Sequence, residues 1–221
     1  MIAFADNNTA DAVTPNEEAT VFVVDDLEAN RDLLEILMKS VGLDVKTFPS
    51  AMAFLDTFDP SQSGCLLLDI RMPNMSGLEL QKELKARDIS IPVIIVTAHS
   101  DVPVAIQAMK EGAFDFIEKP FNNQFVLDRV YKALEASNRD QEKTLIRSDI
   151  LARIESMTPR EHEVMNRVVI GEPNKVIAHA LDITSRTVEV HRARMMIKMQ
   201  AATLADLVRM VVLVEAGDQH G

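Results

Sequence analysis

The strongest constraint on the fold is a regular alternation of short apolar runs with amphipathic segments. Five runs have the length and residue types of strands: Thr20–Val24, Asp44–Phe48, Cys65–Leu68, Pro92–Thr97 and Asp115–Glu118. Helical spacing follows each run, which predicts helices over Asn30–Val41, Ala51–Thr57, Gly77–Arg87, Val102–Glu111 and from Asn122. The apolar face expected of the first helix consists of Leu33, Leu34, Leu37 and Met38. Strands that alternate with helices form a parallel sheet covered on both faces. We therefore predict a doubly wound α/β domain with five parallel strands.

The third run marks a candidate functional edge. Cys65–Leu68 is uninterrupted and apolar, stops at Asp69, and is followed by turn residues up to Gly77. Such a run is typical of a strand that is buried on both faces. A carboxylate at its end lies at the carboxyl edge of the sheet, where open α/β sheets bind their ligands. Taken alone, Asp69 is better explained as a cap of the turn after a core strand.

Polar residues also follow the other strands. The first run ends in Asp25 and Asp26, the fourth ends at Thr97, and Lys119 follows the fifth. Because the carboxyl ends of parallel strands share one edge, we expect these side chains to converge with Asp69. Three carboxylates close together repel one another in a site of low effective dielectric, and a hard dication with oxygen ligands removes that repulsion. The sequence therefore predicts Mg²⁺ bound at this edge.

The same cluster predicts phosphoryl chemistry. With its charge neutralised, Asp69 can attack a phosphoryl group as a nucleophile, while Lys119 and the Thr97 hydroxyl hold the phosphoryl oxygens. Two alternatives are a set of unrelated strand-end caps and an aspartate-nucleophile phosphatase. Phosphatases that resemble the haloacid dehalogenase family need a second acid two residues after the nucleophile, and Arg71 stands at that position.

Four motifs occur in order along this region: V-F-V-V-D-D, L-L-L-D-I-R-M-P-N-M-S-G, V-I-I-V-T-A-H and D-F-I-E-K-P. Together they resemble the receiver domain of two-component response regulators over residues 20–138. The resemblance implies a flavodoxin-like fold. It also makes Asp69 the phosphoacceptor for a phosphohistidine on a sensor histidine kinase.

The resemblance further assigns metal ligands and a switch. The metal contacts that it implies are Asp26, Asp69, the backbone carbonyl of Arg71, and Asp25 through water. Thr97 and Phe116 become a switch pair, in which the Thr97 hydroxyl turns toward the phosphoryl oxygens and the Phe116 ring moves inward.

The remainder of the chain predicts a second, all-helical domain. Phe121 to Thr158 contains no Gly or Pro, which favours a largely helical connector with a candidate break at Asn138. Thr158, followed by Pro159 and Glu161, forms a capping box that starts a helix. Four short helices are expected: Pro159–Val169, Asn174–Leu181, Arg186–Met199 and Leu204–Glu215.

A tight turn between the second and third of these helices indicates a helix-turn-helix. The third helix has an expected inward face of Val188, His191, Met195 and Met199. Its outward side includes Glu189, able to accept from a cytosine amino group, and Val190, able to touch a thymine methyl. The predicted DNA contacts are Lys175, Arg186, Thr187, Glu189, Val190, Arg192, Ala193, Arg194 and Lys198. The alternative is that these charges form only a solvated helix face.

Three further motifs carry a second resemblance: M-T-P-R-E-H-E-V-M, N-K-V-I-A-H-A-L-D-I-T-S-R-T-V-E-V-H-R-A-R and A-D-L-V-R-M. They are similar to the LuxR-type DNA-binding domain over residues 157–213, and the sequence T-V-E-V-H-R-A-R with the long connector is most similar to the FixJ branch of response regulators. The predicted organisation is a disordered acidic arm (1–18), a receiver domain (19–138), a helical linker (139–156) and a LuxR-type helix-turn-helix domain (157–221).

Charge and cysteine content agree with this organisation. The formal net charge is -11, but residues 150–221 hold nine Lys or Arg and nine Asp or Glu, so all of the acidic excess lies earlier in the chain. The helix-turn-helix region is thus free of the net negative charge that would repel DNA. The single cysteine, Cys65, lies in an apolar run, and no secretory or membrane-spanning segment is evident, so a cytoplasmic protein is expected.

The sequence therefore predicts a response regulator that is not an enzyme apart from its own phosphorylation and dephosphorylation at Asp69. Expected partners are a sensor histidine kinase, promoter DNA, RNA polymerase and, on phosphorylation, a second copy of the chain, with no membrane partner. The main alternative is a constitutive DNA-binding regulator whose receiver is only structural.

Overall fold

The computed structural model describes residues 19–98 and 102–217. The chain divides into two compact units, Met1–Gln141 and Glu142–Gly221. The predicted disordered arm at residues 1–18 lies outside the described residues.

The first unit contains a five-stranded sheet in which every neighbouring pair is parallel. Its strands are β1 (Thr20–Val24), β2 (Asp44–Phe48), β3 (Gly64–Asp69), β4 (Val93–Ala98) and β5 (Asp115–Lys119). The strand order is β2-β1-β3-β4-β5. Because the order reverses beside β1, the chain is wound in both directions along the sheet. The predicted doubly wound α/β fold is confirmed.

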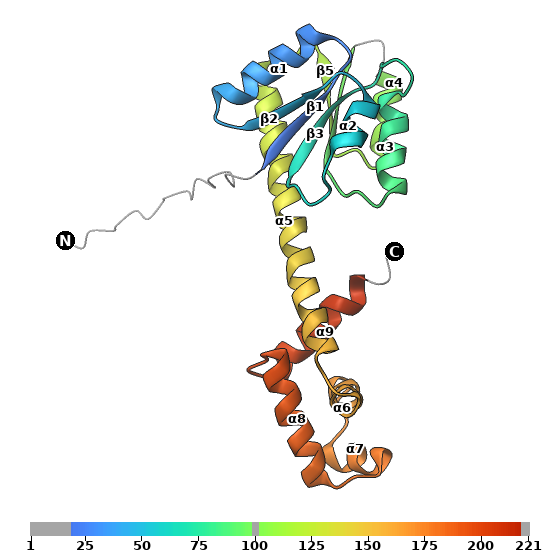
Figure 1. Ribbon diagram of the computed structural model, residues 1–221, viewed down its shortest axis with the longest axis vertical. Coiled ribbons are helices and arrows are strands. Elements are labelled where there is room, and N and C mark those ends of the chain that lie inside the picture. Colours follow the sequence, from blue (N-terminus) through green and yellow to red (C-terminus); the bar gives the residue numbers. More distant parts are fainter. Residues whose placement is uncertain (1–18, 99–101, 218–221) are drawn as a thin grey trace, which may run out of the picture. The chain divides into compact units, whose positions relative to one another are not determined.

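Helices cover both faces of this sheet (Figure 1). The helix α1 (Glu28–Ser40) and the first part of α5 (Asn123–Glu155) pack on one face, whereas α2 (Ala51–Thr57), α3 (Gly77–Ala86) and α4 (Val102–Lys110) cover the other. Side chains alternate along each strand, so two separate apolar cores form, one under each helical layer. Both cores use β1, β3 and β4, which explains why these strands are apolar at nearly every position.

One predicted core residue of α1 is exposed. Leu34, Leu37 and Met38 are buried as expected, but Leu33 is 48% exposed. Successive residues on an α-helix point about 100° apart, so Leu33 falls at the edge of the stripe that Leu34 and its partners form. The prediction that Leu33 faces the core is wrong.

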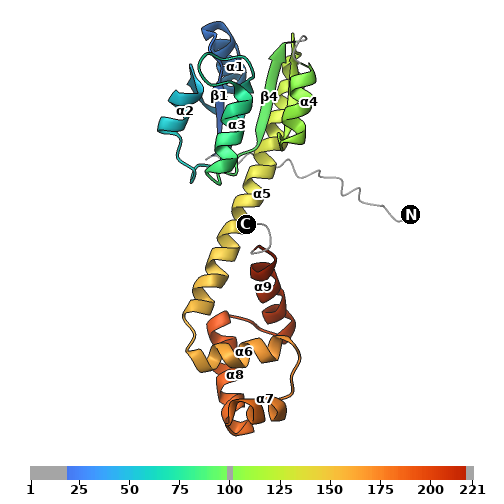
Figure 2. The ribbon, with the colours of Figure 1, turned by 90° about the vertical axis from the view of Figure 1, so that its right-hand side faces the viewer.

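The second unit is built from α6 (Pro159–Val169), α7 (Asn174–Leu181), α8 (Ser185–Met199) and α9 (Leu204–Gly217), together with the end of α5. Figure 2 shows these helices from the side. The capping box at the start of α6 is confirmed, because Thr158 and Glu161 each bond the backbone N–H of the other. The side chain of Thr184 caps α8 by accepting from the N–H of Thr187.

The connector α5 is continuous over its 33 residues. The candidate break at Asn138 is absent, because its side-chain oxygen accepts from the Ser63 hydroxyl at 2.7 Å and does not compete with the helix backbone. The predicted domain boundary at residue 138 falls inside α5 and remains a prediction. Among the helices that the structure describes, none has a stretch apolar and long enough to cross a bilayer.

Candidate functional site

An ammonium group joins two carboxylates at the carboxyl edge of the sheet. The Nζ of Lys119, at the end of β5, lies 2.9 Å from Oδ2 of Asp25 and 2.8 Å from Oδ1 of Asp69. Asp25 directly follows β1 and Asp69 ends β3, and the register pairs Val24 with Leu68, the residues that precede them on these neighbouring strands. The parallel sheet thus brings together residues that are 50 and 94 positions apart in sequence.

Asp25 is 2% exposed and is held from several directions. Its Oδ1 accepts from the N–H of Leu27 at 2.9 Å, and the amide of Asn30, in the first turn of α1, donates to both carboxylate oxygens. Arg31 donates to the backbone carbonyls of Asp25 and Asp26 at 2.8 and 3.0 Å. These bonds satisfy the oxygens of a buried carboxylate and fix it in position.

The loop after β3 fixes the backbone at Asp69. The N–H of Arg71 donates to Oδ2 of Asp69 at 2.7 Å, and the N–H of Gly77 donates to the carbonyl of Ile70 at 2.9 Å. A Cβ placed on Gly77 would lie only 2.3 Å from the carbonyl oxygen of Asp69, so only glycine fits here without displacing the backbone. Asn74, at the tip, has a left-handed φ of 68°.

The site is short of positive charge. Burial raises the pKa of the Asp69 carboxyl and the charge of Asp25 raises it further, although Lys119 and the Arg71 N–H act in the opposite direction. For Lys119, burial acts to lower the pKa, but the hydrogen bonds and charges of Asp69 and Asp25 outweigh it, and the pKa is raised. One ammonium group therefore does not compensate the two carboxylates that it joins.

These residues fit a small, hard cation. Across residues 19–98 and 102–217, no three His, Cys, Asp or Glu side chains lie together as a metal cluster, and the two carboxylates brought together are Asp25 and Asp69. Mg²⁺ in phosphoryl-transfer sites commonly uses only one or two carboxylates and keeps several waters. The uncompensated negative charge and the oxygen donors suit that ion. Asp26 is half-buried next to Asp25.

The raised pKa of Asp69 has a consequence for stability. The folded chain holds the Asp69 proton more tightly than the unfolded chain, so the free energy of unfolding of the first unit, without metal, should fall as the pH rises above the ordinary value of 3.8. Asp69→Asn should remove this contribution and raise Tm by a few degrees at neutral pH in chelator. Thermal unfolding of both proteins from acid to neutral pH tests this. Parallel curves would contradict it.

The predicted switch residues lie near this site. Thr97, on β4, is 1% exposed, and Phe116, on β5, is half-buried against the core beneath α2, α3 and α4. In the register Ile95 pairs with Phe116 and Thr97 pairs with Glu118. Paired residues share a face, as do residues two apart in a strand, so Thr97 and Phe116 are diagonal neighbours on the same face.

The helix-turn-helix presents most of its predicted DNA contacts to solvent. On α8, Val188, Met195 and Met199 are buried as expected, and His191 is half-buried. Thr187 is half-buried, with its hydroxyl 2.8 Å from that of Thr184. The exposed predicted contacts are Lys175, Arg186, Glu189, Val190, Ala193 and Arg194.

Two predicted contacts are engaged within the second unit. The ammonium of Lys198 lies 2.7 Å from Oε2 of Glu161 and 2.7 Å from the carbonyl of Ser156. The guanidinium of Arg192 donates to Oδ1 of Asn174 at 3.0 Å. The structure therefore does not place Arg192 and Lys198 with the exposed set.

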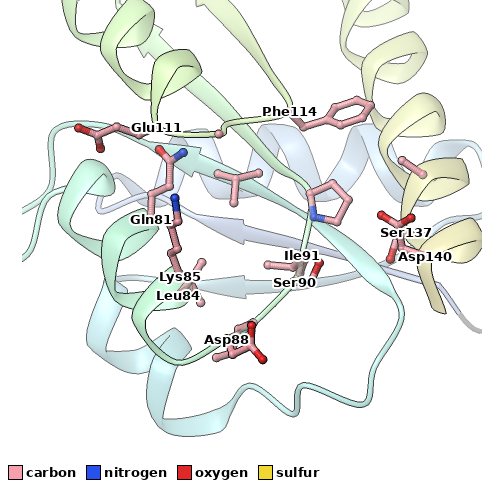
Figure 3. A pocket seen from close by; sticks show the side chains of 15 residues that line it. Gln81, Leu84, Lys85, Asp88, Ser90, Ile91, Glu111, Phe114, Ser137 and Asp140 are labelled. Carbon is pink, nitrogen blue, oxygen red and sulfur yellow. The ribbon is translucent and has the colours of Figure 1, made fainter. Parts of the chain in front are cut away.

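A cavity in the first unit lies away from the candidate site. Its volume is about 520 Å³, and its walls come from α3, α5 and the segments that precede β4 and β5 (Figure 3). It therefore opens at the amino edge of these strands, opposite Asp69. Gln81 and Glu111 line it, and the Gln81 amide donates to the carbonyl of Ala108.

Some residues of these sites were not predicted. Asn30 and Arg31 hold Asp25 and its backbone, and their signal was the polar first turn of the helix after D-D. Glu161 was predicted only as a capping residue, yet it also binds Lys198. Its other role depends on a contact 37 residues away, which no local pattern reveals.

Two family models match the chain. Residues 21–131 match the response regulator receiver domain, and residues 155–211 match the bacterial regulatory proteins of the luxR family. The first match contains Asp25, Asp69 and Lys119, and the second contains the whole of α6, α7 and α8.

Known proteins match over most of the length. The chain is 46% identical to the transcriptional regulatory protein FixJ of Azorhizobium caulinodans, over 89% of this chain and 93% of that protein. It is 45% identical to FixJ of Rhizobium meliloti, over 87% and 95%. Among solved structures, the response regulator StyR has a TM-score of 0.80 at 41% identity, covering 88% of this chain and 98% of that chain. Full-length FixJ from B. japonicum has a TM-score of 0.54 at 40% identity, covering 89% and 97%.

Proposed function

Since the chain belongs to the FixJ-type response regulators of two-component systems, with a receiver domain and a LuxR-type DNA-binding domain, we propose that phosphorylation of Asp69 controls its binding to promoter DNA. The observation that carries this proposal is the contact of Lys119 with both Asp25 and Asp69 at the sheet edge. A buried, charged cluster that no packing argument requires is a candidate for chemistry.

The proposed reaction is transfer of a phosphoryl group from a histidine of a sensor kinase. An oxygen of Asp69 forms a bond to phosphorus as the bond from phosphorus to the histidine nitrogen breaks, and the electron pair of that bond stays on the imidazole. Asp69 can act as the nucleophile because its carboxylate is held by Lys119 and by the Arg71 N–H. Lys119 and Thr97 would bind the transferred oxygens.

Mg²⁺ is the proposed cofactor. Asp25, Asp26, Asp69 and the backbone carbonyl of Arg71 would hold it, and it would supply positive charge for the phosphoryl oxygens. Asn30 and Arg31 keep the Asp25 segment in place for this task through the hydrogen bonds described above.

The proposed output begins at Thr97 and Phe116. A phosphoryl group on Asp69 attracts the Thr97 hydroxyl, and the ring of Phe116 moves inward into the space that the threonine leaves. This changes the surface of α4 and β5, where Ile106, Met109 and Phe114 are exposed apolar side chains. Covering these side chains in a dimer is the proposed response, and it would pair two recognition helices on DNA, where RNA polymerase is the further expected partner.

The assembly step is tested by size-exclusion chromatography with light scattering. Wild type and Asp69→Asn are compared in Mg²⁺, with and without beryllofluoride as a mimic of aspartyl phosphate. Only the wild type with beryllofluoride should shift from the mass of a monomer to that of a dimer. A wild type that keeps its mass in every condition would overturn the proposal that dimerisation is the output.

The regulated DNA binding is tested separately. Wild-type affinity for a duplex selected from a random pool should rise at least tenfold with beryllofluoride, because two linked recognition helices bind with a high effective concentration. Equal affinity in both states would favour the constitutive regulator with a structural receiver.

A further inference from the structure

A polar link joins α8 to the start of α7, the helix that precedes it. The Nη1 of Arg192 donates to Oδ1 of Asn174 at 3.0 Å, and both residues are half-buried. Asn174 is the first residue of α7, whereas Arg192 is near the middle of α8. The role of this link bears on how α8 is presented to DNA and rests on the proposed DNA-binding function.

The position of Arg192 around α8 separates it from the exposed face. At about 100° per residue, Arg192 lies roughly 40° from Val188, which is fully buried. Ala193 and Arg194 lie roughly 140° and 120° from Val188 on the same scale, and both are exposed. The side chain of Arg192 therefore leaves the helix on the side that faces α7, not on the side that is open to solvent.

The hydrogen bond between Arg192 and Asn174 has a fixed direction, which the apolar contacts between these helices do not have. Ile177 of α7 and Val188 of α8 are fully buried in the shared core, and such contacts are non-directional. A guanidinium is planar and its N–H groups have fixed directions, so its bond to an amide oxygen sets an angle as well as a distance. The N-cap of α7 is Pro173, whose side chain has no polar atom, and the Asn174 side chain at the next position accepts from Arg192.

We propose that Arg192 is a positioning residue, which holds α8 at the correct angle to α7 through Asn174 and makes no phosphate contact of its own. Its removal lowers affinity for a specific DNA site because the exposed residues of α8 no longer fit the major groove together. Asn174 has the same role from the other side of the link.

The test measures DNA affinity of the full chain, with Mg²⁺ and beryllofluoride, as a function of salt. The probe is the duplex selected by the wild type, and the variants are Arg192→Ala, Asn174→Ala, the double variant and, as a matched control for an exposed arginine of the same helix, Arg194→Ala. A lost phosphate contact reduces the slope of log K against log[salt] by about 0.9, whereas a change of helix angle alone does not.

Arg192→Ala should weaken binding about tenfold with the wild-type slope, because no phosphate contact is lost. Asn174→Ala, which keeps the arginine charge, should weaken binding similarly, and the double variant should be no weaker than the worse single variant. Arg194→Ala should reduce the slope. Circular dichroism of each variant at the assay temperature identifies any variant that unfolds. If Arg192→Ala unfolds, Asn174→Ala alone tests the proposal, because it breaks the same hydrogen bond without removing a charge.

Two results would overturn the inference: a slope reduced by about 0.9 in Arg192→Ala with full binding in Asn174→Ala, or unchanged affinity in both. Either result leaves the proposed function standing, because wild-type binding is measured in the same series. Absence of DNA binding by the wild type would instead count against the proposed function itself.

Discussion

Asp69→Asn abolishes stable phosphoryl labelling by a cognate kinase, with at least a hundredfold loss of incorporated label. The asparagine amide keeps the size of the side chain but lacks the carboxylate oxygen that must form the bond to phosphorus. Incubation with a radiolabelled phosphorylated kinase, followed by denaturing electrophoresis, measures the label that remains on the chain. Retention of full label by the variant would remove Asp69 from the role of phosphoacceptor.

A matched control is available away from the site, at the opposite edge of the sheet. Asp88 lies between α3 and the start of β4, away from the carboxyl ends of the strands. Asp88→Asn should therefore be labelled like the wild type. Thermal unfolding of Asp69→Asn measures separately whether a loss of fold contributes to the result at Asp69. The two experiments on this residue therefore separate chemistry from stability.

Glu161→Gln destabilises the second unit by about 2 kcal/mol, which corresponds to roughly 10 °C in Tm for a unit of this size. Glu161 is 3% exposed and binds both Lys198 and the start of α6. Glutamine can keep the capping bond but not the charge that pairs with Lys198. Hydrogen exchange of the buried amides in α6 and α8 measures this change in the full chain.

The same contacts make the stability of the second unit depend on pH. The hydrogen bond from Lys198, followed by that from the Thr158 N–H, lowers the pKa of Glu161 from 4.5 to about 2. Because the folded pKa is lowered, the stabilisation is fully present above pH 4.5 and is lost as the pH falls toward 2. Glu163→Gln is the control, since Glu163 pairs with Arg160 at the exposed surface and should change stability by less than about 0.5 kcal/mol. Equal effects of the two substitutions would contradict this account.

The receiver fold and the candidate site were predictable from sequence for one reason. Parallel strands place all their carboxyl ends on one edge of the sheet. The positions of Asp25, Asp69 and Lys119 at strand ends therefore predicted that they converge, before any interatomic distance was known. The contacts of Asn30 with Asp25 were not predictable in this way, because many polar residues occupy first turns of helices without reaching a neighbouring strand end.

The predicted DNA contacts show where sequence patterns lose information. A lysine that bonds Glu161 and a lysine that reaches DNA have the same local sequence signal, so Lys198 was grouped with the exposed cations. The position of Arg192 around α8, close to that of the buried Val188, was a weak sign that it faces the protein. A count of basic residues does not use that position. The prediction for Leu33 was wrong for a related reason. The leucines of α1 extend around more of the helix than the stripe that packs against the sheet.

The close approach of Gly77 to the backbone of Asp69 divides the loop after β3 into two classes of position. Position 77 admits no other amino acid without displacing the residue at which the proposed chemistry occurs. Pro73 and Asn74 are exposed at the tip, where the left-handed φ of Asn74 is set by the turn. Substitutions at the tip should therefore be tolerated more readily than any at position 77, where a side chain would displace the backbone of the proposed nucleophile.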